Sequence, residues 1–144
     1  MSAIRELALA KATGGGGGTV DPSYCIAKYP ATVTTFNYET IKYPEVLIVP
    51  NTASVFGEGI CTNRSEIKKL IMQSPLVEII NGACYGATNL DYVYIPATVT
   101  TIGSLSFTGV KGTIDCGFAE GAVSGAPWGA TNATIHYNVA EPSE

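Results

Sequence analysis

The chain has 144 residues, of which 46% are hydrophobic and 14% charged, and its formal net charge is -4. This composition excludes a disordered chain and suits one domain with a sizeable core. The eight lysines and arginines are scattered except for the pair Lys68 and Lys69, so no clustered basic face is available for a nucleic acid. No stretch comes near the roughly 20 apolar residues of a membrane span, so we expect no membrane insertion.

The N-terminal segment 1–13 is predicted to form a helical anchor. Residues 2–12 are good helix formers, and Ser2 suits the N-cap position. One face of this helix carries the four residues that we expect to make its contact, Ile4, Leu7, Ala8 and Lys11. A helix of this length is marginal in water on its own, so it needs a partner surface or further copies of itself, which would make a homo-oligomer.

The residues that follow predict a tether and then a repeat domain. Arg5 and Glu6 interrupt the apolar run that a secretory signal needs, so we do not expect one here. The run Gly14–Gly18 predicts a flexible linker, because no Gly-Lys-Ser/Thr follows to make a phosphate-binding loop. We therefore divide the chain into five parts: anchor 1–13, poly-Gly linker 14–18, solenoid 19–115, C-terminal cap 116–138 and tail 139–144.

Internal repeats dominate the solenoid region. Residues 30–36 and 96–102 match at six of seven positions, as Pro-Ala-Thr-Val-Thr-Thr-Phe and Pro-Ala-Thr-Val-Thr-Thr-Ile, at an offset of 66. Hexads that begin at Phe56, Ile80 and Ile102 align at offsets of 24 and 22. Three short apolar segments precede or separate these hexads and are predicted to be strands: 47–49, 70–72 and 93–95.

A unit of this length cannot bury its own apolar face, whereas stacked copies bury it against each other. We therefore predict a mainly β solenoid of about four repeats, each of roughly 22–24 residues. Its strands would pair at about 4.8 Å. The Gly or Asn at the second hexad position predicts a positive φ. Ile102, Leu105 and Phe107 are expected to point inward, with Cys61 and Tyr85 at the Phe107 position and Cys84 beside it.

The four cysteines, Cys25, Cys61, Cys84 and Cys116, contain no Cys-x-x-Cys pair, which argues against zinc. Free thiols that behave as small buried hydrophobic groups are favoured, and a disulfide is left open.

Residues 95–107, Ile-Pro-Ala-Thr-Val-Thr-Thr-Ile-Gly-Ser-Leu-Ser-Phe, resemble the BspA-type leucine-rich repeat, whose consensus is Ile-Pro-x-x-Val-Thr-x-Ile-Gly-x-x-Ala-Phe. The resemblance extends over most of the predicted solenoid; it is strong here, moderate at 29–36, and weak between, where Gln73 and Ser74 replace Ile-Pro. It implies a non-enzymatic structural or adhesive module.

Two further resemblances concern the ends of the chain. Residues 118–138 are similar to the closing segment of BspA-type proteins encoded in prophages of gut Firmicutes, and residues 4–18 resemble the start of virion proteins from that setting. These resemblances imply a virion accessory protein that is made in the host cytoplasm. It would attach through residues 1–13 to virion structural proteins, and its solenoid would contact a host-surface protein or glycan. A bacterial cell-surface or secreted adhesin is the alternative.

The sequence offers no recognisable catalytic or cofactor site. His136 is the only histidine and is expected to be a solvated or hydrogen-bonded strand residue. Neither a Gly-x-Ser-x-Gly motif nor a calcium loop occurs, so we expect no enzyme, cofactor or metal. Trp128 is predicted to cover the last tier, with a ligand-stacking role as the alternative, and Thr134–Tyr137 is predicted to be the closing strand.

Tyr92 and Tyr94 are the leading candidates for partner binding. They alternate with Val93 and Ile95, so one of the two pairs faces outward from the predicted strand. Tyrosine offers a large contact area with a polar tip and recurs in binding surfaces. The alternative is that these tyrosines are ordinary strand formers on a twisted sheet.

Overall fold

The computed structural model describes residues 26–27, 46–49, 51, 53–57, 61, 63, 65 and 67–142. This part of the chain is mainly β and contains no helix, and therefore no helix that could cross a membrane. The predicted helix 2–12, the glycine run and the first Pro-Ala-Thr-Val-Thr-Thr copy at 30–36 lie outside these residues.

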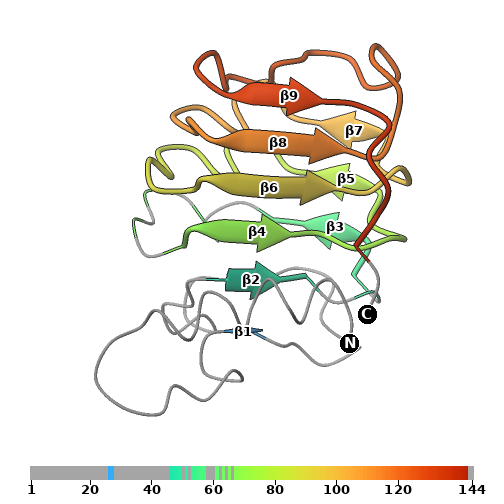
Figure 1. The fold of residues 1–144 in the computed structure, drawn as a ribbon, viewed down its shortest axis with the longest axis horizontal. Coiled ribbons are helices and arrows are strands. Elements are labelled where there is room, and N and C mark those ends of the chain that lie inside the picture. The colour runs from blue at the N-terminus through green and yellow to red at the C-terminus, as the bar shows by residue number, and fades with distance from the viewer. Residues whose placement is uncertain are drawn as a thin grey trace.

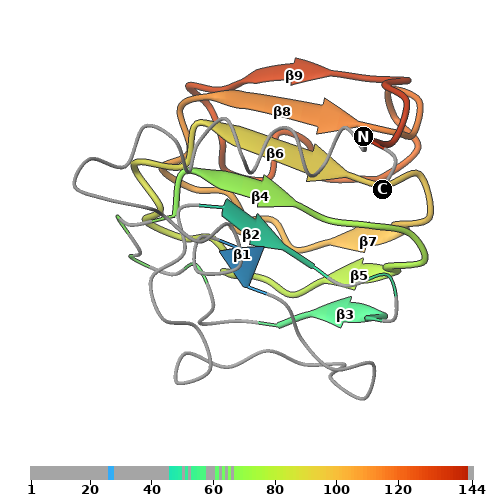
Figure 2. The same cartoon turned by 60° about the horizontal axis from the view of Figure 1, so that its bottom comes forward.

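The strands form two parallel sheets that face each other, so the chain winds as a β-solenoid of about four turns (Figures 1 and 2). The larger sheet has the order β1 (Ile26–Ala27), β2 (Val46–Ile48), β4 (Lys69–Ile71), β6 (Tyr92–Ile95), β8 (Thr113–Cys116) and β9 (Thr134–His136). The smaller sheet contains β3 (Val55–Phe56), β5 (Glu78–Ile79) and β7 (Thr101–Ile102). Each turn of the chain, here called a rung, contributes one strand to the larger sheet, and the rungs of β2, β4 and β6 then contribute β3, β5 and β7 to the smaller one.

The core lies between the two sheets, where equivalent apolar side chains stack from rung to rung. On the larger sheet the register pairs Leu47 with Leu70, Leu70 with Val93 and Val93 with Ile114, and all four side chains are fully buried. A matching column on the smaller sheet consists of Phe56, Ile79 and Ile102. Each such buried side chain stabilises the fold by roughly 1.5–3 kcal/mol. The predicted solenoid, and the predicted alignment of the strand segments 47–49, 70–72 and 93–95, are therefore confirmed.

The register corrects the predicted alignment of the hexads by one residue. Ile79, and not Ile80, pairs with Phe56 on one side and Ile102 on the other, so the two offsets are equal. As a result Cys84 takes the position equivalent to Phe107, and Tyr85 moves out into the turn with 46% of its surface exposed. Cys61 is buried, as predicted.

Two further expectations for the hexad were wrong. Leu105 does not point inward; 48% of it is exposed, because it lies in the turn after β7 and its N–H donates to Asn81 Oδ1 over 2.8 Å. The glycine at the second position, Gly103, has no positive φ. A Cβ there would overlap the backbone of Asn81 on the rung below, so glycine is required by close approach rather than by a left-handed turn.

Residues 116–138, the predicted cap, stack on the solenoid as its last described turn. Strand β9 pairs in parallel with β8, and the Phe107 N–H donates to the Trp128 carbonyl over 2.9 Å, so this segment is the last rung. The predicted closing strand is confirmed as β9. Trp128 is fully buried and makes edge-to-face contacts with Phe107 and Phe118. Its large ring fills the interior of the final rung.

Candidate functional site

The outer face of the larger sheet changes character along the stack. Because side chains alternate along a strand, the residues flanking the inward column point outward. In rung order these outward residues are Val46 and Ile48, Lys69 and Ile71, Tyr92 and Tyr94, Thr113 and Asp115, and Thr134 and His136. The face is thus apolar at β2, amphipathic at β6 and polar at β8 and β9.

The apolar half of this face forms a second hydrophobic cluster. Val46, Ile48, Ile71 and Tyr94 are each buried, and Tyr92 and Val139 pack against them. Parallel sheets are usually covered on both faces, and this half of the outer face follows that rule.

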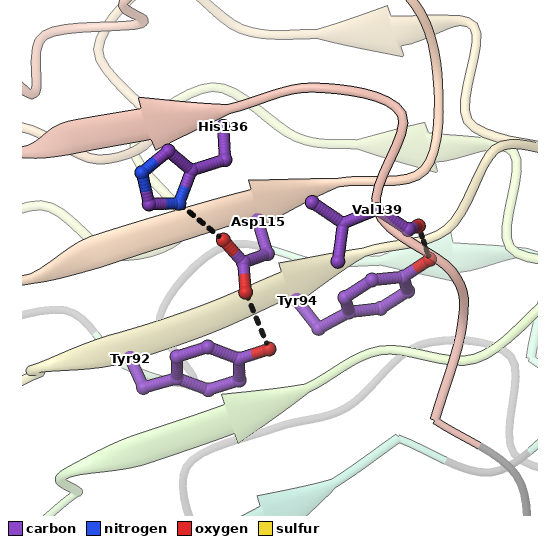
Figure 3. A network of polar contacts seen from close by, with 5 residues as sticks. All are labelled: Tyr92, Tyr94, Asp115, His136 and Val139. Atoms are coloured by element: carbon purple, nitrogen blue, oxygen red, sulfur yellow. Dashed lines mark hydrogen bonds and ion pairs between the residues drawn. The ribbon is translucent and has the colours of Figure 1, made fainter.

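The polar half carries four side chains that are in contact across successive strands, Lys69, Tyr92, Asp115 and His136, here called the polar row. Figure 3 shows the last three of them. The Tyr92 hydroxyl donates to Asp115 Oδ2 over 3.0 Å, and His136 Nδ1 lies 3.0 Å from Asp115 Oδ1. A carboxylate only accepts, so Nδ1 carries the hydrogen of this second bond. Lys69 Nζ lies 5.5 Å from the centre of the Tyr92 ring, within the range of a cation–π contact.

The polar row is accessible to solvent at the end that His136 forms. The His136 side chain is 58% exposed and that of Asp115 is 16% exposed, while Tyr92 is half-buried. Burial, followed by the hydrogen bond to Asp115, raises the pKa of Tyr92 well above its usual value. Its hydroxyl therefore remains protonated at neutral pH and holds the carboxylate in place. His136 is the hydrogen-bonded strand residue that the sequence predicted.

Tyr94 corrects one expectation, because it points to the outer face but is not exposed there. Only 1% of it is accessible, and its hydroxyl donates to the Val139 carbonyl over 2.7 Å (Figure 3). Burial is the main cause that raises the pKa of Tyr94 to about 12, and Glu141 is the next. Of the two tyrosines singled out from the sequence, Tyr92 alone belongs to the accessible polar row.

Residues 138–141 cover Tyr94 by running back across the ends of three strands, and we call them the C-terminal strap. The Asn138 N–H donates to the Phe118 carbonyl and the Val139 N–H to the Cys116 carbonyl. Further along, the N–H and hydroxyl of Ser74 donate to the Glu141 carboxylate at 3.2 and 3.1 Å. The tail predicted at 139–144 thus begins as an ordered segment that covers the Tyr94 side of the outer face.

No set of three or more metal-ligating side chains comes together in the described part of the chain. The four predicted anchor residues, Ile4, Leu7, Ala8 and Lys11, lie outside the described residues, so their role stays a prediction. What the polar row offers is a fixed set of hydrogen-bonding groups with an aromatic ring beside an ammonium group.

No family model matches this chain, and neither a curated protein nor a solved structure resembles it closely enough to indicate a relationship.

Proposed function

We propose that the chain is a non-enzymatic binding module, a BspA-type leucine-rich-repeat solenoid displayed on a phage particle. In this proposal residues 1–13 attach it to virion structural proteins, and the outer face of the solenoid contacts a glycan or glycoprotein of the host or its mucosa. The resemblance of residues 95–107 to the BspA-type repeat supports the family, because this segment spans β7 and the turns on both sides of it, which form one side of a rung.

The polar row is the observation that carries the binding role. Both oxygens of the Asp115 carboxylate are engaged, one by Tyr92 and the other by His136. A carboxylate held in this way suits recognition better than proton transfer, because its position is fixed and its charge is shared with its donors. Sugar hydroxyls both donate and accept, so they can pair with the accessible edges of Asp115 and His136.

Replacing His136 with alanine is expected to weaken adhesion of the full chain to a mucin-coated surface by roughly tenfold, the value of one hydrogen bond to a charged group. Because the ring is mostly exposed, the fold should be unaffected. Thr101→Ala is the matched control, since Thr101 is an exposed strand residue on the opposite sheet. Equal adhesion of all three proteins would exclude the polar row, and absence of adhesion by the parent chain would exclude the binding role.

The attachment role has its own test in the phage. Deletion of residues 2–13 is expected to remove the protein from purified particles, because the anchor face would be lost, while the thermal unfolding midpoint of the solenoid stays the same. Particle-bound protein is measured by immunoblotting of density-purified phage. If the truncated chain still co-purifies with particles, the anchor is elsewhere. Recovery of the full chain in the cell-wall fraction and not in particles would instead favour a bacterial surface adhesin.

A further inference from the structure

Two buried thiols occupy equivalent positions on neighbouring rungs. Cys61 and Cys84 are both free and fully buried. The Cys61 N–H donates to the Ala83 carbonyl over 3.2 Å and the Asn63 N–H to the Tyr85 carbonyl over 2.8 Å. In a parallel ladder these two bonds set Cys61 directly opposite Cys84.

This placement is compatible with the Cα spacing of a disulfide. Paired parallel segments run about 4.8 Å apart, and a disulfide needs Cα atoms roughly 4.4–6.8 Å apart. Both side chains are fully buried, so they lie in the core at equivalent positions of neighbouring rungs. Cys116 belongs to a different column, at the end of β8 on the larger sheet. The pairing is therefore specific to Cys61 and Cys84 among the three described cysteines.

We propose that Cys61 and Cys84 form a modification site, at which a peroxide oxidises the two thiols to a disulfide that links two rungs. The thiolate of one cysteine attacks a peroxide oxygen, which gives a sulfenic acid and one molecule of water after protonation. The second thiol then attacks the sulfenic sulfur, and the hydroxyl group leaves as a second water. Two thiols and one hydrogen peroxide thus yield one disulfide and two waters.

The surroundings of the pair set the rate of this reaction. Burial, followed by the hydrogen bond and charge of Cys61, raises the pKa of Cys84 well above its ordinary value. The thiolate is the reactive form, so oxidation is slow in the folded protein at neutral pH and accelerates as the pH rises. The thiols persist in a reducing cytoplasm and close on exposure to an oxidising medium. This inference is independent of the proposed function.

The experiment uses the full, reduced chain, treated with hydrogen peroxide at pH 8 and then alkylated under denaturing conditions. The expected product is lighter than the reduced chain by about 2 Da before alkylation and has lost two alkylation sites. Trypsin cleaves after Arg64, Lys68 and Lys69, so Cys61 and Cys84 fall in separate peptides. Those two peptides should appear cross-linked, and the cross-link should be absent from Cys61→Ser and Cys84→Ser, whereas Cys116→Ser is the control that retains it.

A second readout reports on the role of the bond. The oxidised chain is expected to unfold at a midpoint temperature roughly 5–15 °C higher than the reduced chain, because the bond closes a loop of about 24 residues in the unfolded state. Cross-linked peptides that join Cys25 or Cys116 to another cysteine would overturn the proposal. So would oxidation of the folded chain to sulfinic or sulfonic acids without a disulfide, or an unchanged or lower midpoint after the disulfide has formed.

Discussion

Replacing Trp128 with alanine is expected to lower the free energy of unfolding by about 3–5 kcal/mol, the largest effect of any single side-chain truncation in the last rung. The ring is fully buried, its centre lies 6.4 Å from that of Phe107 and 6.0 Å from that of Phe118, and its Nε1–H donates to the Ser124 carbonyl over 3.0 Å. Alanine would leave a cavity between two rungs and remove both aromatic contacts. Urea unfolding of the purified chain, followed by circular dichroism, measures the loss.

Leu105→Ala provides the control for this experiment. Leu105 is 48% exposed in the turn after β7, so its truncation should change the free energy of unfolding by less than about 0.5 kcal/mol. A cost below about 1 kcal/mol for Trp128→Ala would contradict the interior role and revive the ligand-stacking role that the sequence left open. Weaker mucin adhesion of Trp128→Ala with an unchanged free energy of unfolding would likewise support the ligand-stacking role.

The stacking of strands could be predicted from the sequence because its cause is local. Each segment, at 47–49, 70–72 and 93–95, is its own short apolar run, and equivalent residues such as Leu70 and Val93 recur at a constant spacing. Burial of each segment depends on a neighbour of the same kind, so similarity between copies is itself the structural signal.

The register of the smaller sheet could not be predicted in the same way. Ile79 and Ile80 are both apolar, so the sequence alone allowed either to align with Ile102. The choice is made by backbone hydrogen bonds, such as that from the Ile80 N–H to the Phe56 carbonyl. A shift of one residue exchanges the inward and outward positions, which is why Cys84 is interior and Tyr85 is not.

The candidate site was found only in part, because its rungs differ in length. Tyr92 was recognised from alternation within one strand, but Asp115 and His136 were not assigned to it. The repeat becomes shorter after β6, and this change brings Asp115 and His136 into line with Tyr94 on the outer face. A search that allowed for this shorter repeat would have aligned β8 with β9. The strap over Tyr94 has no local signal, since Glu141 bonds to Ser74, which lies far from it in the sequence.

Gly103→Ala is expected to destabilise the fold by about 3 kcal/mol, at the upper end of the cost of overpacking. The methyl group would overlap the Cα, Cβ and N atoms of Asn81 on the adjacent rung, and backbone atoms held by a neighbouring rung cannot turn aside as the end of a flexible side chain can. Two consecutive rungs would therefore have to separate locally, which weakens the hydrogen bond from the Gly103 N–H to the Ile79 carbonyl. Urea unfolding measures this loss as well.

Gly82→Ala separates this steric cost from the conformational cost of replacing a glycine. Gly82 has a φ of 81°, but a Cβ there would meet nothing within 4 Å. Its replacement should therefore cost only about 1 kcal/mol, the strain of placing alanine in the left-handed region. Gly103 has the opposite combination of an ordinary φ and a crowded position. If Gly82→Ala lowered the free energy of unfolding more than Gly103→Ala, the backbone conformation of the turn would be the reason for glycine at these positions. The close approach of the rungs would then not be the reason. Neighbouring rungs would then have room for a methyl group between Gly103 and Asn81.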